Sequence, residues 1–350
     1  MAQEKKKVTI SDIAAAAGVS KATVSRYING KSELMTPQTK ERIRMVISLL
    51  DYHPNSAARS LKTKKNHQIG VLLSNIETPF AASLIVGIGN CLHQKGYEPL
   101  FVDCHNSISK EEEAIASFLD RMVEGLLVNT TFIENPALIK ASCDGCNIVL
   151  CDRFVNHYDF NIVTIDQDES MLRLVEHLKD QGYTRPVLFA QRWENNSTRQ
   201  RRLKAFLHAV EAVYGYTPTE DIYTVGHESH QSRDQLETLL ERLREGEKAA
   251  IVGINSETTV LVYQALCAKG LQIPRQIGLC GFEDWDWESV MNWATLVNPP
   301  VTSISVPTKE MGYRAAEMLV QLIEGEGHTK PRTIMLPTQL VIRQSTQLKG

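Results

Sequence analysis

At 350 residues the chain exceeds what one ordinary hydrophobic core organises, so its length predicts two or three domains, and its 43% hydrophobic and 23% charged residues are typical of a globular protein. No run reaches the roughly 18 apolar residues of a membrane-spanning helix, and no continuous apolar segment follows the charged residues 1–7, which excludes a secretory signal and favours the cytoplasm. The net charge of −3 hides an asymmetry: residues 1–65 carry 13 Lys and Arg against 5 Asp and Glu, and the remainder carries 25 against 36.

This division of charge predicts two parts with different tasks. Because a protein that neutralises phosphates must concentrate cations on one face, the basic start of the chain predicts a small nucleic-acid-binding module. The acidic remainder predicts a body that does something else.

Residues 9–30 have the pattern of two short helices joined by a tight turn. Ser11 can accept a hydrogen bond from an early helical N–H, the alanines at 14–17 favour helix, and Gly18 allows the chain to turn. Ser20 can then cap the second helix.

The second helix has an apolar side and a polar side. Val24 and Ile28 lie one turn apart and face inward. The side chains that remain outside are Lys21, Ala22, Ser25 and Arg26. A helix, a glycine turn and a polar second helix predict a helix-turn-helix.

A third helix is predicted to begin at Thr36-Pro37, where a capping residue precedes a proline whose missing N–H costs nothing. Its apolar residues recur at helical spacing and predict a stripe that packs against the first two helices: Ile43, Val46, Ile47 and Leu50. Pro54 marks its end. A generic three-helix bundle with a solvated basic face is the alternative, but the coincidence of charge and turn geometry favours DNA binding.

The next segment, residues 55–62, is too short for a stable helix alone and too polar for a core, so it predicts a linker that orders only on DNA. Together, residues 19–30 and 52–61 closely resemble the LacI/GalR family of bacterial repressors, and the resemblance extends over almost the whole chain. It implies a hinge helix at residues 55–61 that enters the minor groove. The hinge residues expected to contact DNA are Asn55, Ala58 and Leu61, with Leu61 as an apolar wedge at the operator centre, the kind of residue that unstacks a base step.

The same resemblance assigns roles within the second helix. In the family, three positions of this helix contact base edges, and they correspond to Lys21, Ala22 and Arg26. Three others contact DNA phosphates or stabilise the helix, and they correspond to Ser20, Thr23 and Ser25. An arginine can make two parallel hydrogen bonds to guanine in the major groove, which suits Arg26 to this task.

From residue 67 onward, short apolar runs alternate with helical stretches. Near-continuous apolar strands separated by helices are typical of parallel sheets covered on both faces. A first series is followed by a second, which predicts two doubly wound subdomains; the runs lie at 69–73, 99–102, 125–128, 148–151 and 162–165, then at 187–190, 250–254 and 277–282.

Polar residues follow several of these runs. In open α/β sheets ligands bind beyond the carboxyl ends of the strands, so these residues are candidates to line a cleft between the subdomains: Asn129, Asp152, Arg153, Asn255, Glu283 and Asp284. Buried sugar hydroxyls need such hydrogen-bonding partners. Trp285 and Trp287 lie beside this cleft loop, where an indole could stack on a sugar or pack in a core or interface.

The family resemblance implies a body like the periplasmic sugar-binding proteins. Asp152, Arg202 and Asn255 match the family pattern, and Asn129 and Phe80 are expected on the other wall. The chain departs from the pattern at two positions, because Glu283 stands where an Asp is usual and Ser256 replaces the second residue of an Asn-Asp pair.

The charges predict an acidic effector as one alternative. Arg153 and Arg202 would bring two positive charges into the cleft, which suits a sugar acid such as an aldonate or a 2-keto-3-deoxy sugar acid. The recognition helix also resembles that of regulators of 2-keto-3-deoxygluconate or gluconate catabolism. A neutral sugar is the other alternative.

Rival functions find less support in the sequence. Gly87-Ile88-Gly89 lacks the third glycine and the preceding strand of a nucleotide-binding fingerprint, and no nucleophile-elbow, phosphate-loop or HExxH motif occurs, so catalysis is not expected. Among the seven cysteines only Cys143 and Cys146 have motif spacing, and without a second pair a simple turn is favoured over a redox or metal site; we expect no metal and no cofactor. A soluble sugar-binding protein without DNA function, or a regulator controlled by a protein corepressor, are the remaining alternatives.

The predicted architecture is an N-terminal all-α helix-turn-helix domain plus an α/β periplasmic-binding-protein-like body of two doubly wound parallel-sheet subdomains. The boundaries are 1–54 for the DNA-binding domain, 55–66 for the hinge and linker, and 67–350 for the body, split into 67–165 plus 300–325 and 166–299 plus 326–350. One helix-turn-helix covers few base pairs, so a homodimer on a pseudo-palindromic operator is expected. Residues 339–350 contain no heptad tail for a tetramer.

Overall fold

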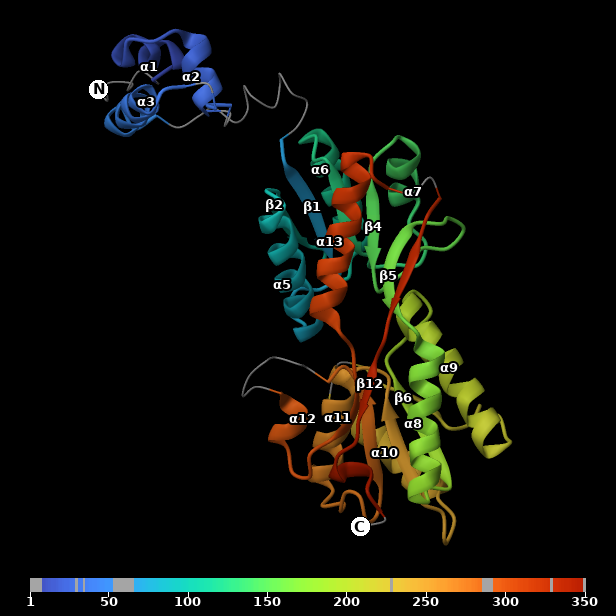
Figure 1. The fold of residues 1–350 in the computed structure, drawn as a ribbon. Coiled ribbons are helices and arrows are strands. Elements are labelled where there is room, and N and C mark those ends of the chain that lie inside the picture. The colour runs from blue at the N-terminus through green and yellow to red at the C-terminus, as the bar shows by residue number, and fades with distance from the viewer. Residues whose placement is uncertain are drawn as a thin grey trace, which may run out of the picture. The chain divides into compact units, whose positions relative to one another are not determined.

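The computed structural model describes residues 8–28, 31–33, 35–52, 66–226, 229–284, 292–327 and 330–348 (Figure 1). The chain divides into two units, residues 1–66 and 67–350. The first unit is helical, and the second contains two six-stranded sheets with helices. The predicted fold class is therefore confirmed.

The first unit contains α1 (Ile10–Ala17), α2 (Lys21–Ile28) and α3 (Pro37–Leu49). Thr9 caps α1 in a reciprocal capping box with Asp12, so the prediction that Ser11 is the cap was wrong by two residues. Gly18 ends α1 in the left-handed conformation at φ 62°, as the turn requires. Thr36 caps α3 and Pro37 is its first residue, as predicted.

A small apolar core holds these three helices together. Ile13 and Val24 are fully buried and cluster with Tyr52, while Ile43 of α3 is also fully buried. Val46, Ile47 and Leu50 pack against the cluster as partly buried side chains. The predicted inward stripes of α2 and α3 are therefore where the helices meet.

The first sheet of the second unit has the strand order β11-β5-β4-β3-β1-β2. Every recorded neighbour pair in it is parallel, as the continuous apolar runs predict. Its strands are β1 (Gln68–Leu73), β2 (Glu98–Asp103), β3 (Gly125–Asn129), β4 (Ile148–Cys151), β5 (Asn161–Ile165) and β11 (Thr333–Leu336).

Helices cover both faces of this sheet. One face packs against α5 (Pro79–Gln94) and α13 (Thr308–Glu324), which lie side by side, and the other against α6 (Ile108–Asp120) and α7 (Pro136–Cys143) (Figure 1). The two helices α5 and α13 approach closely because Gly87 faces the α13 backbone; a Cβ at Gly87 would lie 1.9 Å from the carbonyl oxygen of Lys309. Gly87 thus serves helix packing, whereas a Cβ at Gly89 would meet open space.

The second sheet has the order β12-β10-β9-β8-β6-β7 and is parallel except for its antiparallel edge strand β12. Its strands are β6 (Arg185–Ala190), β7 (Ile222–Thr224), β8 (Ala249–Gly253), β9 (Gly278–Phe282), β10 (Thr302–Ser305) and β12 (Gln339–Val341). One face carries α8 (Gln167–Gln181) and α9 (Ser197–Tyr214); the other carries α10 (Ser229–Arg242) and α11 (Ser256–Ala268). The short α12 (Trp293–Leu296) and a 3-10 turn at Gln344–Thr346 complete this subdomain.

Within the described residues the chain crosses between the two sheets at three places: after β5, after β10 and after β11. The predicted subdomain segments 300–325 and 326–350 therefore need correction. Strand β10 pairs with β9 in the second sheet, and β11 pairs with β5 in the first. The crossing after β5 falls where expected, and the other two fall one strand later, because the short strands β10 and β11 carry too little pattern to show which sheet they join.

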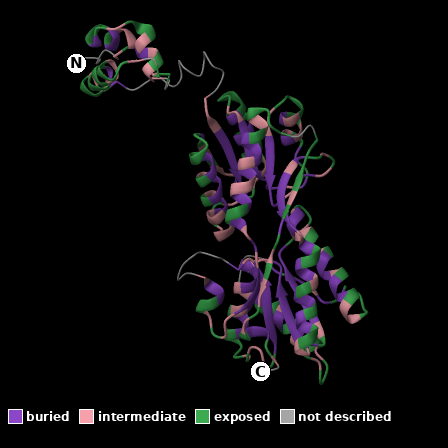
Figure 2. Ribbon diagram, in the orientation of Figure 1, coloured by how far each residue is buried: buried purple, intermediate pink, exposed green. Residues whose placement is uncertain are grey.

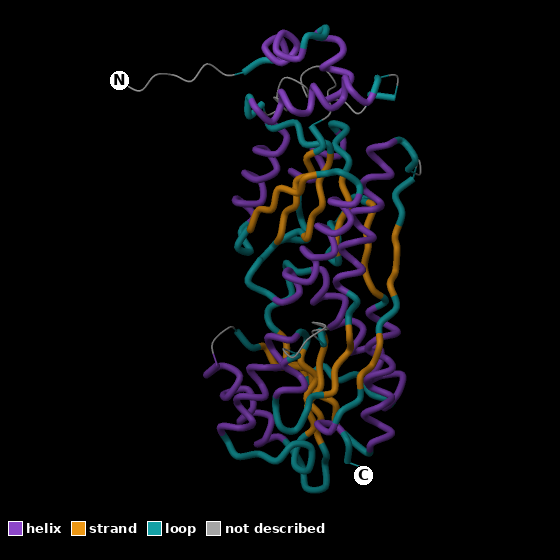
Figure 3. The backbone as a smooth tube through the Cα atoms, turned by 60° about the vertical axis from the view of Figure 1, so that its left-hand side comes forward, coloured by secondary structure: helices purple, strands orange, loops and turns teal. Residues whose placement is uncertain are grey.

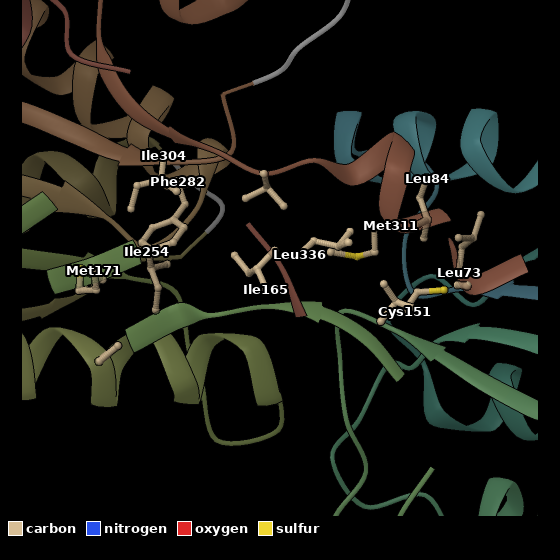
Figure 4. Close-up of a cluster of buried hydrophobic side chains, with 14 of the residues drawn as sticks. Leu73, Leu84, Cys151, Ile165, Met171, Ile254, Phe282, Ile304, Met311 and Leu336 are labelled. Carbon is tan, nitrogen blue, oxygen red and sulfur yellow. The ribbon is translucent and has the colours of Figure 1, made fainter. Parts of the chain in front are cut away.

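Buried residues concentrate in the strands of both sheets (Figure 2), and the flanking helices enclose them (Figure 3). The largest cluster of buried side chains continues across the junction of the subdomains. Figure 4 shows Ile165 and Leu336, which precede two of the crossings, between Phe282 on one side and Met311 on the other. Apolar packing thus joins the subdomains while leaving a polar cavity beside it. No helix in the described part of the chain is long and apolar enough to cross a membrane.

Candidate functional site

The outer face of α2 presents the residue types predicted for it. Lys21, Ala22 and Arg26 are exposed, and Ser25 is half-buried one turn after Lys21. Ala22 and Arg26 are also four residues apart, so all four side chains share one side of the helix. This side is polar and cationic, whereas Val24 on the opposite side is fully buried.

Ser20 and Thr23 organise the start of α2. The Thr23 backbone N–H donates to Ser20 Oγ over 3.1 Å, and the two hydroxyls lie 2.8 Å apart. A helix begun in this way offers its remaining free N–H groups and its dipole to an anion such as a phosphate. The predicted hinge residues Asn55, Ala58 and Leu61 lie outside the described residues.

The body contains a cavity of about 470 Å³ where the carboxyl ends of strands from both sheets meet. All seven residues predicted for a ligand line it: Phe80, Asn129, Asp152, Arg153, Arg202, Asn255 and Glu283. They come from both subdomains, so a molecule in this cavity contacts both. The volume suits a small ligand.

A larger cavity of about 650 Å³ shares Pro79, Phe80 and Glu283 with the first. It lies among the first turns of α5 and α13 and the crossing segments. Of the predicted polar residues that follow the strands it contains only Glu283 and Asp284. Asp284 was expected in the cleft, but it does not line the smaller cavity, and its Oδ2 instead accepts from Arg343 Nη2 over 2.5 Å. The smaller cavity, at the strand ends, is therefore the candidate binding site; we call it the cleft.

One wall of the cleft is fixed by hydrogen bonds around Asn129 and Asp152. Asn129 Oδ1 accepts from Ser74 Oγ over 2.8 Å, and its Nδ2 donates to the Cys151 carbonyl over 2.9 Å. Asp152 adopts φ 65°, an uncommon backbone state for an aspartate, and its Oδ2 accepts from Thr198 Oγ1 over 2.8 Å. Because Thr198 lies on α9, this hydrogen bond joins the two subdomains.

Arg202 is the most buried charged group of the opposite wall. Its side chain is 2% exposed and donates to Glu283 Oε1 over 2.8 Å and to the Ile254 carbonyl over 2.9 Å. Its Nε donates to Gln167 over 3.1 Å. Arg202 is therefore neutralised by Glu283, which corrects the expectation that it brings a free positive charge to a ligand.

The two departures from the family pattern meet at this carboxylate. Ser256 Oγ donates to Glu283 Oε2 over 2.8 Å. Burial alone raises the pKa of the Glu283 carboxyl, but the Arg202 charge and the hydrogen bonds from Arg202 and Ser256 outweigh burial and lower that pKa. The longer Glu283 thus reaches both partners, from a backbone at φ 70°.

Asn255 begins α11, where its Oδ1 accepts from the Thr258 N–H over 2.9 Å, and its Nδ2 donates to Gln191 Oε1 over 3.0 Å. Gln191 Oε1 also accepts from Arg199 Nη2. Arg199, which sequence reasoning missed, lines the cleft as well. The signal was present, because Arg199 and Arg202 are three residues apart on α9 and so share one helix face.

Two buried polar atoms of the cleft residues have no hydrogen-bond partner within the described structure. They are the acceptor Asp152 Oδ1 and the donor Arg202 Nη2. A buried polar atom without a partner costs roughly 1–3 kcal/mol. A ligand that forms hydrogen bonds with both atoms removes this cost and therefore binds more tightly. Hydroxyl groups fit, since each can donate to one atom or accept from the other.

Other candidate residues lie elsewhere or outside the described chain. Trp285 and Trp287 are not among the described residues. Cys143 is exposed at the end of α7, and burial raises the pKa of the Cys146 thiol to about 11, which leaves it protonated and unreactive at neutral pH. Among the described residues, no three His, Cys, Asp or Glu side chains gather in a way that could hold a metal ion.

Comparisons with known proteins cover both units. The family described as bacterial regulatory proteins, lacI family, matches residues 9–55, and a periplasmic binding protein-like domain matches residues 175–346. The HTH-type transcriptional regulator KdgR of Bacillus subtilis (strain 168) is 31% identical over 340 residues, which cover 96% of this chain and 97% of the relative. PtxS of Pseudomonas aeruginosa, also an HTH-type transcriptional regulator, is 30% identical over 348 residues, covering 98% and 97%.

Solved structures match over nearly the same length. The lac repressor dimer bound to operator and the anti-inducer ONPF superposes with a TM-score of 0.84 at 23% identity, covering 97% of this chain and 99% of that chain. The complex of the transcriptional regulator CelR with cellobiose gives 0.70 at 24% identity, covering 97% and 100%. At these identities the structures establish a shared fold.

Proposed function

Because the chain belongs to the LacI family of bacterial transcriptional regulators, we propose that it represses a carbohydrate catabolic operon and that a small sugar or sugar acid in the cleft switches its affinity for operator DNA. The observation that carries the proposal is the pair of unsatisfied buried atoms, Asp152 Oδ1 and Arg202 Nη2, within a cavity of about 470 Å³. A polyhydroxylated ligand supplies the missing partners for both.

The operator is read by the outer face of α2. Arg26 and Lys21 are exposed beside Ala22, so they can reach base edges without leaving a core. Ser20 and Thr23 at the helix start, together with Ser25, contact phosphates or hold the helix against the backbone of the DNA. The hinge residues Asn55, Ala58 and Leu61 complete the interface in the minor groove.

A homodimer places two such helices on one operator, about 34–36 Å apart. Exposed apolar side chains at the edge of the first sheet support dimer formation. Val86 on α5 is 46% exposed, and Phe101 on the neighbouring strand β2 is 36% exposed. A second copy of the chain would cover them.

The ligand acts by its differential affinity for two arrangements of the subdomains. Residues that contact it come from both sides of the crossings, so a closed arrangement satisfies more of its hydrogen bonds than an open one. Closure changes the position of the start of β1. Because residues 55–66 join β1 to the DNA-binding helices in the sequence, this change alters the affinity for operator DNA. Catalysis has no part in this scheme.

Two variants test the proposal, with operator binding measured by fluorescence anisotropy and ligand binding by calorimetry. Arg26→Ala should lose operator affinity and keep ligand affinity, whereas Arg202→Ala should keep operator affinity and lose the ligand response. If both variants damaged operator binding alone, the cleft would not be the ligand site.

A further inference from the structure

The three arginines of the cleft have different partners. Arg202 forms an ion pair with Glu283. Arg153 Nη1 donates to the Thr130 carbonyl over 2.9 Å, and Arg199 donates to the Arg192 carbonyl over 3.0 Å and to the Gln191 amide oxygen. Among the residues that the structure describes, neither Arg153 nor Arg199 forms an ion pair within 4.0 Å, and both donate their hydrogen bonds to neutral oxygens.

These two arginines stand on opposite sides of the cleft. Arg153 follows β4 of the first sheet, and Arg199 lies in the first turn of α9, which packs on the second sheet. Both line the same cavity. A ligand in this cavity can therefore meet a cation from each subdomain.

The surroundings make both charges costly. Burial lowers the pKa of the Arg153 guanidinium, despite the opposing charges of Asp152 and Glu111. Burial and the positive charge of Arg153 together lower the pKa of Arg199 to about 10. Both groups remain charged at neutral pH, and they repel each other. A bound anion would relieve the cost of burial and the repulsion together.

Carboxylates also line the cleft, so the argument rests on how the charges are paired and not on their sum. Glu283 is engaged by Arg202 and Ser256, and Asp152 accepts from Thr198. Glu77 is exposed. The charge of Glu257 acts favourably on Arg199 without offsetting its burial.

We infer that Arg153 and Arg199 bind the negatively charged group of the effector, one from each subdomain, so that the cleft selects a polyhydroxylated anion over a neutral sugar of the same size. The inference rests on the proposed function and adds the chemical class of the ligand. Two planar guanidiniums match the oxygens of a carboxylate or a phosphate. Asp152 and Arg202 then hold hydroxyl groups of the same molecule.

Bridging the subdomains also links the anion to the switch. An anion between Arg153 and Arg199 favours the closed arrangement, because closing brings both cations to it and removes their repulsion. A neutral sugar makes the hydroxyl contacts but leaves the repulsion in place. The anion thus supplies the differential affinity that a switch requires.

Calorimetry with matched ligands tests the inference on the full-length protein. The pairs are D-gluconate with D-glucitol, D-galactonate with galactitol, and D-glucose 6-phosphate with D-glucose; the first two probe a carboxylate and the third a phosphate. In at least one pair the anion should bind more tightly by about ten- to a hundredfold, as expected for hydrogen bonds to charged groups.

Three variants identify the residues responsible. Arg199→Gln should weaken binding of the anion and leave the neutral partner unchanged, and Arg153→Gln should do the same from the other subdomain. Lys204→Gln is the matched control, because Lys204 is an exposed cation on the same helix outside the cleft. A thermal unfolding midpoint within about 2 °C of wild type establishes that each variant is folded, since in a protein this size such a shift corresponds to only about 1.5 kcal/mol.

The outcomes separate the inference from the proposed function. Neutral partners that bind as tightly as their anions in all three pairs, or an Arg199→Gln variant that weakens both partners equally, would overturn the anion site while the sugar-responsive switch stands. Failure of every anion and every neutral sugar to bind would overturn both.

Discussion

The ion pair between Arg202 and Glu283 allows a quantitative prediction. Replacing Glu283 with alanine leaves the Arg202 guanidinium, on a side chain 2% exposed, without its counter-charge. Breaking a buried ion pair by removing one partner costs about 3–5 kcal/mol of the free energy of unfolding. Alanine retains a Cβ, so the backbone strain at φ 70° is not relieved.

Two features of the structure set where in this range the effect falls. The hydrogen bonds from Ser256 to Glu283 are also lost, which adds ~0.5–1.5 kcal/mol. Water in the adjoining cavity can rehydrate part of the guanidinium, and Arg202 keeps its bonds to Gln167 and Ile254, which both reduce the cost. We therefore expect a loss of about 3 kcal/mol.

The assay is urea unfolding of the full-length protein, followed by tryptophan fluorescence at a fixed protein concentration. Glu220→Ala is the control, because Glu220 pairs with Arg242 at the same distance of 2.8 Å but is 81% exposed. That variant should lose no more than ~1 kcal/mol.

A double variant isolates the buried charge. Arg202→Met combined with Glu283→Ala removes both charges, so it should be more stable than Glu283→Ala alone. The reasoning would be refuted if Glu283→Ala stayed within about 1 kcal/mol of wild type, or if the double variant were the less stable of the two.

Three further predictions concern other parts of the body. Burial raises the pKa of the Glu111 carboxyl above 4.5, so the stabilising contribution of Glu111 is present at low pH and is lost as pH rises through the raised pKa. Relative to Glu111→Gln, the wild type should therefore lose stability to urea between pH 4.5 and neutral pH. A parallel pH dependence of the two proteins would contradict this. Gly87→Ala should lower the free energy of unfolding by at least ~1–3 kcal/mol, because the new Cβ meets the Lys309 carbonyl. Gly89→Ala has open space around its Cβ and should raise the free energy of unfolding by up to ~1 kcal/mol. Equal effects of the two substitutions would contradict the close packing of α5 on α13. Val86→Glu should shift the protein from dimer to monomer in sedimentation velocity, and an unchanged dimer would place the interface elsewhere.

Much of the fold follows from local sequence patterns. The apolar runs predict the strands because a parallel sheet buries each strand on both faces, and the second helix is visible because Val24 and Ile28 repeat at helical spacing. The cleft residues are predictable for a topological reason, since the carboxyl ends of parallel strands meet at one edge. That rule places Asn129 and Asp152 without any knowledge of side-chain contacts.

What the sequence does not reveal depends on pairing in three dimensions. Arg202 looks like a free cation until Glu283 is found 2.8 Å away, across 81 residues of chain. Arg199 looks like part of a surface charge run until the first turn of α9 turns it toward the cleft. The cap of α1 was misassigned because Thr9 and Ser11 are chemically equivalent caps, and only Thr9 stands three residues before Asp12, the spacing of the reciprocal box.

Binding of a ligand in the cleft and binding of operator DNA are expected to be coupled within one chain, and a thermodynamic cycle measures that coupling. Operator affinity is measured with and without saturating ligand by anisotropy, and ligand affinity with and without saturating operator by calorimetry. Because binding free energies are linked, both measurements should give the same factor, about 5- to 150-fold, and Arg202→Ala should abolish it. A ligand affinity that operator DNA leaves unchanged would contradict the account.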